Sequence, residues 1–234
     1  MGFKQKVERM DIEELYHKMK DVVSQLELVQ GTTKFLTIKI GPDNNREAGE
    51  ETLVRYATYS DSIMIYSLND GPQSFLAITR AIGILSRELH KNNLAHRGCL
   101  TFGMMTLDFN NSIFFGRPLT NAHLMQETLH FYGVVVHESA EDAAENHLVQ
   151  FAKQPLTLVR HHVPFKGGGT ASFLTVCPYA DEEQAPYYRW VPECNEFYKK
   201  DAPGLVRIYA QNTSEYFAFA ENDVTGRLNW LQGK

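Results

Sequence analysis

The chain has 234 residues, of which 43% are hydrophobic and 22% are charged, a composition typical of proteins that bury a core. It excludes a disordered chain, a collagen and a coiled coil, and the net charge of −5 gives no sign of an obligate nucleic-acid partner. The longest apolar runs are far shorter than the ~20 residues that span a bilayer, so we expect no membrane insertion. The three cysteines lack metal-binding spacing and predict packed thiols in a reducing cytoplasm.

Hydrophobic periodicity predicts two amphipathic helices in the first half of the chain. Apolar side chains recur every three or four residues across residues 12–26 and again across residues 75–89. In the second helix, the same spacing places Arg80, Arg87 and Lys91 on the opposite face, which we expect to face water.

Strands are predicted between and after these helices, where β-branched and aromatic residues alternate or cluster. The dipeptide Ser60-Asp61 separates two of the strands and predicts a hairpin or a bend in a sheet. The expected strands cover residues 35–40, 52–59, 62–67, 95–105 and 112–115.

The second half of the chain is predicted to contain shorter elements. Pro118 suits the first turn of a helix, and Ser139 is a candidate N-cap for a short acidic helix. Strands are expected at residues 134–136, 156–159, 171–176 and 205–208.

The order of these elements indicates an α+β fold. If one strand preceded Gly2, the order would be β-α-β-β-α-β, the ferredoxin-like arrangement. Without that strand, the sheet lacks the member that normally lies at its centre. We therefore expect a sandwich with a truncated first strand and extra C-terminal strands. It would form a single domain of residues 1–234, with a core of residues 1–148 and an extension of residues 149–234.

The turn between two predicted strands carries the first candidate functional residue, Asp61. A carboxylate that is fixed by two apolar strands and exposed by their turn is well placed to bind a metal ion. The alternative is a structural aspartate that accepts hydrogen bonds from its own backbone, which is the commonest use of Asp in a turn. The local sequence leaves both interpretations open.

Two further segments contain residue types that bind phosphate. Arg97 begins a predicted strand beside Gly98, so its planar guanidinium can hold a phosphate, or it can be a surface arginine beside a bulge. Residues 115–118 precede a helix whose N-terminus can present backbone amides to an anion. A capped helix that packs through its apolar residues is the alternative for this second segment.

Four segments occur in an order that matches a known family: GFK at residues 2–4, YSDSIMI at 59–65, RGCLTFG at 97–103 and IFFGRPL at 113–119. In this order they resemble the class III nucleotidyl cyclase domain. The resemblance is strongest to its bacterial pyrimidine branch, the Pycsar uridylate cyclases of anti-phage defence.

The resemblance implies a reaction in which the 3′-hydroxyl of a nucleoside triphosphate attacks its own α-phosphorus and pyrophosphate leaves. Two divalent ions, Mn²⁺ or Mg²⁺, held by two aspartates on neighbouring strands, would lower the pKa of the hydroxyl and neutralise the leaving charge. Asp61 matches the second aspartate, as a metal ligand and catalytic residue. The first would lie three residues before Gly2, which predicts a start placed too late or a truncation, and low or absent turnover as written.

The segment after the third motif departs from the purine cyclases. Aligned on Gly116, Thr120 and Leu124 stand where those enzymes place an Asn that orients the ribose and an Arg that stabilises the transition state. Asn121, one position away, is a weaker candidate for the first role. Arg97 is the better candidate for stabilising the phosphate charge.

The base is expected to be a pyrimidine. Tyr56 lies where purine cyclases use a polar residue to read the base, and a tyrosine would narrow the pocket; the alternative is a strand tyrosine packed in the core. We prefer Tyr56 to Tyr59 for this role, and assign Phe3, Ser60 and Thr120 to substrate binding with it. The expected substrate is UTP and the product cyclic UMP, with CTP as the nearest alternative.

The resemblance also implies partners. The active sites would lie at the interface of a cytoplasmic homodimer, with groups from both subunits, and a separate effector would sense the product. Two other functions stay open: a non-catalytic nucleotide-binding or dimerisation module on the same fold, and an unrelated ferredoxin-like interaction domain. Turnover separates the cyclase from the first alternative, and affinity for triphosphates separates it from the second.

Overall fold

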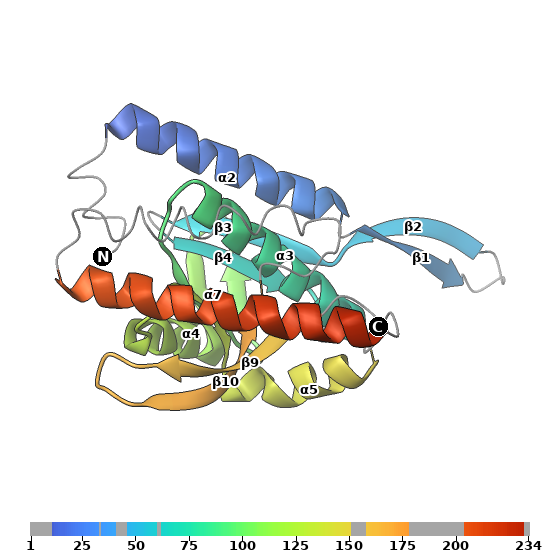
Figure 1. Ribbon diagram of the computed structural model, residues 1–234. Helices are drawn as coiled ribbons and strands as arrows, with labels where there is room; N and C mark the ends of the chain where they lie inside the picture. Colours follow the sequence, from blue (N-terminus) through green and yellow to red (C-terminus); the bar gives the residue numbers. More distant parts are fainter. Residues whose placement is uncertain are drawn as a thin grey trace.

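The computed structural model of the chain describes residues 11–32, 34–40, 46–59, 62–150, 158–177 and 204–231. Within these ranges helices and strands are mixed, which confirms the expected α+β class. The arrangement is a four-stranded sheet with helices on both faces, accompanied by two-stranded hairpins and a long N-terminal helix (Figure 1).

The four-stranded sheet has the order β5-β8-β10-β9. β5 (Arg97–Leu100) and β8 (Gly133–Val136) are parallel, and β10 (Thr170–Val176) pairs antiparallel with β8 and with β9 (Leu158–Pro164). Parallel strands need a crossover connection, and α4 (Arg117–Thr128) lies on the one between β5 and β8. The strands expected at residues 134–136, 156–159 and 171–176 are thereby confirmed in outline.

The sheet is buried on both faces. All four residues of β8 are buried, as expected for a strand covered on both sides. One face packs against α3 (Pro72–Lys91) and α5 (Glu141–Gln150) through a cluster that includes Leu100, Val134, Val136, Leu174, Ala77, Ile78, Ala81 and Ala144. The other face packs against α7 (Gly204–Leu231) through a cluster that includes Val135, Val159, Val163, Cys177, Tyr216, Phe217 and Ala220.

The remaining strands form antiparallel hairpins. They are β1 (Lys34–Ile40) with β2 (Arg46–Thr52), β3 (Val54–Tyr59) with β4 (Ser62–Ser67), and β6 (Thr106–Asp108) with β7 (Ile113–Phe115). The hairpin of β1 and β2 projects away from the rest of the molecule (Figure 1). α2 (Ile12–Thr32) packs on α3 through buried side chains that include Leu15, Val22 and Leu89.

The β3–β4 hairpin and the four-stranded sheet share one hydrophobic core without pairing to each other. Leu53 and Val54 belong to the same buried cluster as Leu100 and Val134, and α3 packs on both sheets. The described strands form separate sheets, so their pairing does not confirm the single sheet of the ferredoxin-like arrangement. That arrangement stays a prediction.

Residues 205–208 were expected to be a strand, and this prediction is wrong. They belong to α7, although Val206 and Ile208 favour strands locally. Buried residues recur every three or four positions through the helix: Val206, Tyr209, Ala210, Thr213, Tyr216, Phe217 and Ala220. Packing of this apolar stripe on the sheet outweighs the local propensity.

The strand expected at residues 95–105 is shorter in the structure, because β5 ends at Leu100. Beyond it, the Thr101 hydroxyl donates to the carbonyl oxygen of Pro118 at 3.0 Å. The backbone N–H of Phe102 donates to Ser139 Oγ at 3.1 Å. These polar groups are therefore satisfied by other elements, and Gly103, at φ +142°, turns the chain away.

The N-cap assigned to Ser139 is also wrong. His137 is the cap of the short turn η1 (Glu138–Ala140), and its Nδ1 accepts a hydrogen bond from the backbone N–H of Ser139 at 3.0 Å. Ser139 lies inside the turn, where its hydroxyl accepts from Phe102 instead. The acidic helix α5 begins directly afterwards, at Glu141.

Two other features of the first half differ from expectation. β2 was not predicted, since its Arg-Glu-Ala-Gly-Glu-Glu-Thr sequence has low strand propensity, yet it pairs with β1 along its whole length. Arg80 is exposed as expected, but only 13% of the Arg87 side chain is exposed, and its Nε lies 3.0 Å from Glu88 Oε1.

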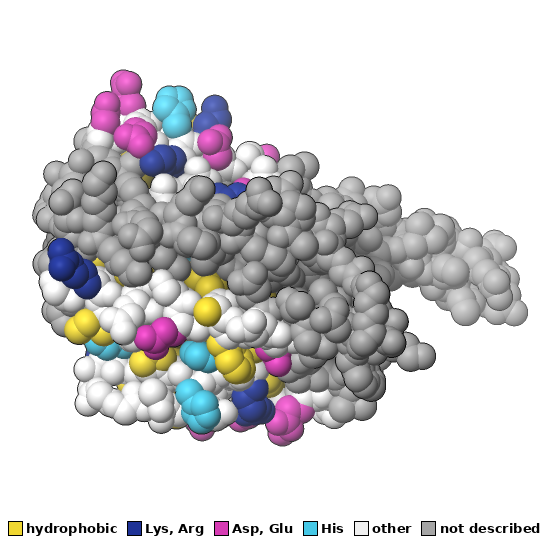
Figure 2. Space-filling view, viewed as in Figure 1, with side chains coloured by type: hydrophobic (Ala, Val, Ile, Leu, Met, Phe, Trp, Pro, Cys, Tyr) yellow, Lys and Arg dark blue, Asp and Glu magenta, His cyan; other side chains and the backbone are white. Residues whose placement is uncertain are grey.

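The surface of α2 is highly charged. On the face seen in Figure 1, acidic, basic and histidine side chains gather on this helix (Figure 2). Glu14 and Lys18 form an ion pair of 2.7 Å, one helical turn apart. None of the described helices combines the length and apolarity that crossing a membrane requires.

Candidate functional site

A groove of about 630 Å³ lies beside the β3–β4 hairpin. One side is formed by the consecutive residues Tyr56, Ala57, Thr58 and Tyr59 of β3, and the other by Phe109, Ser112 and Phe114 of the β6–β7 hairpin. We call this cavity the β3 groove. Its volume lies within the ~300–1,000 Å³ typical of small-molecule sites.

Aromatic contacts hold the two hairpins together. The Tyr59 and Phe114 rings meet edge to face with centroids 4.9 Å apart, and Phe114 meets Phe109 in the same way at 5.1 Å. Phe109 in turn stacks on Tyr66 of β4 at 5.9 Å. Since each such pair adds to the stability gained by burial, this chain of four rings fixes the β6–β7 wall against β3 and β4.

The polar groups of the groove include a tyrosine hydroxyl that lacks a partner. The hydroxyl of Tyr59 is buried and makes no hydrogen bond within the described part of the chain. Burial raises the pKa of Tyr59, with a smaller effect of Tyr66. Burial, and secondarily the charge of Glu27, raises the pKa of Tyr56. Both tyrosines therefore remain protonated hydrogen-bond donors at neutral pH.

Asp61, the candidate metal ligand, closely follows the groove-lining strand β3 in the sequence. Tyr59 pairs with Ser62, so Ser60 and Asp61 are the two residues that connect the strands, as predicted for a hairpin. Ser60 and Asp61 themselves, like Phe3, lie outside the described residues. Of the residues predicted to bind substrate, Tyr56 is the one that the structure places in the groove wall.

Two glycines, Gly103 and Gly116, lie where the third and fourth sequence motifs approach each other. Gly116 has φ +151°, and a Cβ there would lie 2.8 Å from the Cβ of Met105 and 3.0 Å from the Met104 carbonyl oxygen. Gly103 faces the Pro118 ring, which a Cβ would meet at 3.1 Å. Because no other residue fits at Gly116 without a shift, it sets the close approach of the two motifs.

Thr120 and Asn121 lie in the first turns of α4, which begins directly after the β7 strand that carries Phe114. The Thr120 side chain is exposed, and its hydroxyl donates to the carbonyl oxygen of Gly116 at 3.4 Å. Asn121 is half-buried. Both residues therefore follow the groove wall closely along the chain, although neither lines the groove.

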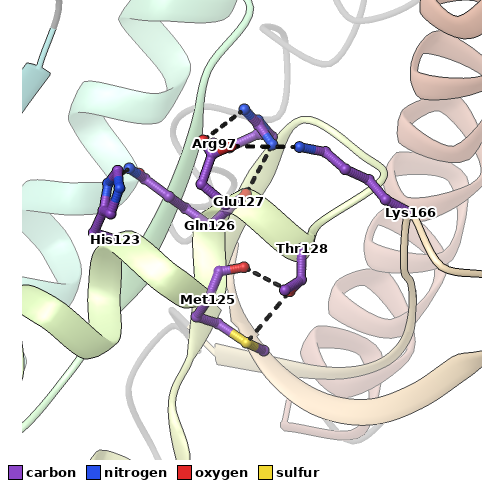
Figure 3. A network of polar contacts seen from close by, with 7 residues as sticks. All are labelled: Arg97, His123, Met125, Gln126, Glu127, Thr128 and Lys166. Carbon is purple, nitrogen blue, oxygen red and sulfur yellow. Dashed lines mark hydrogen bonds and ion pairs between the residues drawn. The ribbon is translucent and has the colours of Figure 1, made fainter.

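Arg97 lies at the other end of α4, where it binds the last turn of that helix (Figure 3). Its Nη1 donates to the carbonyl oxygen of Gln126 at 2.9 Å, and Nη2 lies 3.3 Å from Glu127 Oε1. Lys166 Nζ lies 3.7 Å from the other oxygen of Glu127. The Arg97 guanidinium also lies over the Tyr209 ring of α7, 5.8 Å from its centroid.

These contacts give Arg97 a structural role. Cationic side chains stabilise helix C-termini by binding the last carbonyls, and Arg97 does this for α4 while contacting α7. β5 runs antiparallel to α4, because Thr101 binds Pro118 at the start of the helix and Arg97 binds Gln126 near its end. The two positions are about 12 Å apart along the helix. The described contacts therefore do not bring Arg97 to the β3 groove.

No group of three His, Cys, Asp or Glu side chains that could hold a metal ion occurs in the described ranges. Asp108, in the groove-wall hairpin, uses its carboxylate within its own turn. It accepts from the Asn111 side-chain amide at 2.8 Å and from the Asn111 backbone N–H at 3.0 Å, and these bonds lower its pKa. The described residues thus supply no complete metal site.

Two of the three cysteines expected to be packed, Cys99 and Cys177, are described and agree with that expectation, whereas Cys194 lies outside the described residues. Cys177 is fully buried, and Cys99 packs against the same core cluster. Burial raises the pKa of Cys99 to about 12, so the thiol stays protonated at neutral pH. Neither side chain has the character of a nucleophile.

The groove wall opposite β3 was missed in the sequence. Ser112 and Phe114 lie in the strand expected at residues 112–115, and neither they nor Phe109 were given a functional role. A signal was present, because Phe109 is an aromatic residue inside a polar turn and an exposed aromatic there often marks a binding surface. Comparisons of the chain with protein-family models, curated proteins and solved structures found no significant match.

Proposed function

We propose that the chain is a nucleotidyl cyclase-type domain that binds UTP and forms cyclic UMP and pyrophosphate. The observation that carries this proposal is the β3 groove. Tyr56, selected from the sequence as the base-reading residue, lines a cavity large enough for a nucleobase. The hairpin that carries Ser60 and Asp61 continues from the same strand.

The chain's own residues would then bind and orient the nucleotide. The aromatic walls of the groove exclude water from a flat base, and the Tyr56 and Tyr59 hydroxyls supply polar contacts at its edge. The ribose and phosphates would extend toward the start of α4. There Thr120 and Asn121 lie in the first turns, and Arg117 is an exposed cation that can bind phosphate oxygens.

Arg97 is a weaker candidate for phosphate binding than Arg117. Its guanidinium is engaged by Gln126 and Glu127 at the far end of α4, and a phosphate would have to compete with both. The Mn²⁺ or Mg²⁺ ions that the resemblance implies would supply charge neutralisation at the phosphates, with Asp61 as one ligand. Since Asp61 lies outside the described residues, which hold no complete metal site, we derive no step through these ions.

The wider assignment belongs to the same proposal: a ferredoxin-like cyclase domain that acts as a homodimer in anti-phage signalling, with its product sensed by a separate effector. Support for a self-association surface comes from large apolar side chains exposed around the two glycine motifs. These are Phe102, Met104, Phe109, Ile113, Phe115 and Leu124, of which Met104 is 94% exposed. Exposed apolar surface of this kind favours a protein partner.

Turnover is the test of the proposal. The chain is incubated with each of the four ribonucleoside triphosphates and Mn²⁺, and products are identified by mass spectrometry. We expect cyclic UMP from UTP at the low rate predicted for a chain that lacks the first aspartate, a further loss of product in Asp61→Asn, and an unchanged rate in Asp70→Asn, which alters an exposed loop residue. Saturable UTP binding without any cyclic product would favour the non-catalytic nucleotide-binding module. The absence of triphosphate binding would contradict both.

A further inference from the structure

The outer edge of β3, on the side away from β4, carries backbone N–H and C=O groups that do not bond to β4. In an antiparallel pair, alternate residues direct both their N–H and C=O toward the partner strand. Just beyond the hairpin, the Leu68 N–H donates to the Leu53 carbonyl oxygen at 3.4 Å, so Leu53 faces β4. The register then directs the backbone groups of Ala57 and Tyr59 toward β4, and those of Tyr56 and Thr58 away from it.

Tyr56 and Thr58, whose backbone groups form this outer edge, both line the β3 groove. Four consecutive residues of β3 line the cavity, as expected when a strand presents its edge rather than one of its faces. Within the described part of the chain, β3 pairs with β4 alone. The N–H and C=O of Tyr56 therefore form an adjacent donor and acceptor at the groove, with no described backbone partner.

The rest of the groove suits a flat ring. Phe109 and Phe114 form the other wall of the groove, and ring contacts with Tyr59 and Tyr66, on one face of the β3–β4 hairpin, fix their positions. The buried Tyr59 hydroxyl is an independent sign of a missing polar partner, because buried hydroxyls are nearly always hydrogen-bonded in native proteins.

We propose that the backbone N–H and C=O of Tyr56 read a planar heterocycle through an adjacent hydrogen-bond acceptor and donor, with the Tyr59 hydroxyl as a further contact. This rests on the proposed function, in which the heterocycle is the base of UTP. The uracil imide offers such an edge: N3–H donates to the Tyr56 carbonyl oxygen, and a neighbouring carbonyl oxygen accepts from the Tyr56 N–H. Base recognition would thus depend on the strand edge, with the Tyr56 side chain forming part of the wall.

Amide exchange measured by NMR on the full chain tests the edge directly. Saturating UTP is expected to slow exchange of the Tyr56 amide at least tenfold, whereas the Ala57 amide, already directed toward β4, serves as the internal control. Equal effects on the two amides, or no effect on Tyr56, would overturn the proposal. Protection of Tyr56 that rises with protein concentration without nucleotide would assign the edge to a second copy and overturn it as well.

A matched pair of ligands separates this inference from the proposed function. N3-methyl-UTP lacks the imide donor, so we expect calorimetry to show binding at least tenfold weaker than that of UTP. Tyr59→Phe is expected to weaken UTP binding several-fold, with Tyr16→Phe on the outer face of α2 as the control. Turnover with equal affinity for both nucleotides would overturn the edge contact and leave the cyclase intact. Discrimination between them without turnover would support the edge contact and contradict the cyclase.

Discussion

Replacing Gly116 with alanine is expected to destabilise the fold strongly. The residue has φ +151° and ψ 159°, a region that only glycine adopts without strain, at a cost of about 1–3 kcal/mol for other residues. The new Cβ would also lie 2.8 Å from the Cβ and 2.9 Å from the Cα of Met105. Because one of these atoms is backbone, relief requires a shift of the chain, and overpacking of this kind costs about 1–3 kcal/mol. The sum is a loss of about 2–6 kcal/mol.

Urea unfolding followed by circular dichroism measures this loss, and Gly167→Ala provides the control. A Cβ at Gly167 meets nothing within 4 Å, so that variant is expected to stay within about 0.5 kcal/mol of the parent. In a chain of this size each kcal/mol lowers the Tm by about 2–4 °C. Gly116→Ala and Gly167→Ala variants of equal stability would refute the argument that the two motifs meet at Gly116.

Three further predictions concern Arg97, His96 and Tyr216. Arg97→Ala should lower the free energy of unfolding by about 1–3 kcal/mol through loss of the α4 cap, and Arg97→Lys should recover only part of it; an unchanged urea midpoint would contradict the capping role. Burial lowers the pKa of His96 to about 4, and its Nε2 lies 2.7 Å from Ser86 Oγ. The unfolded chain therefore binds the proton first, and stability should fall as pH drops from about 6.5 toward 4. His96→Gln should flatten this slope in unfolding measured across that range, and an identical slope would refute the assignment. Tyr216→Phe removes the hydroxyl that donates to the Val176 carbonyl oxygen at 3.1 Å in the core, and should cost about 1–2 kcal/mol in chemical denaturation; a variant as stable as the parent would show that this bond contributes nothing.

The elements with a strong local pattern were predictable from the sequence. The apolar periodicity of α3 and the continuous run of Val134, Val135 and Val136 in β8 depend on near neighbours along the chain, and the structure confirms both. α7 was misread at its start, because Val206 and Ile208 favour a strand until the buried stripe that continues to Ala220 is considered. Propensity read over four residues is weaker than packing summed over a long helix.

Only one wall of the candidate site could be predicted from the sequence. Tyr56 and the hairpin were evident from the sequence, since they lie on one strand. Its opposite wall depends on how Phe109 and Phe114 pack across to Tyr59 and Tyr66, which is tertiary information. The partners of Arg97 likewise come from α4 and α7, far along the chain, so its guanidinium could be assigned to phosphate before those contacts were known.

A crystal structure of the chain with the α,β-methylene analogue of UTP and Mn²⁺ tests the central claim most directly. We predict that the uracil lies between β3 and the β6–β7 hairpin, within hydrogen-bond distance of the Tyr56 backbone, with the phosphates leading toward Arg117 and a metal ion at Asp61. A nucleotide bound elsewhere, or an empty groove at saturating analogue, would contradict the account.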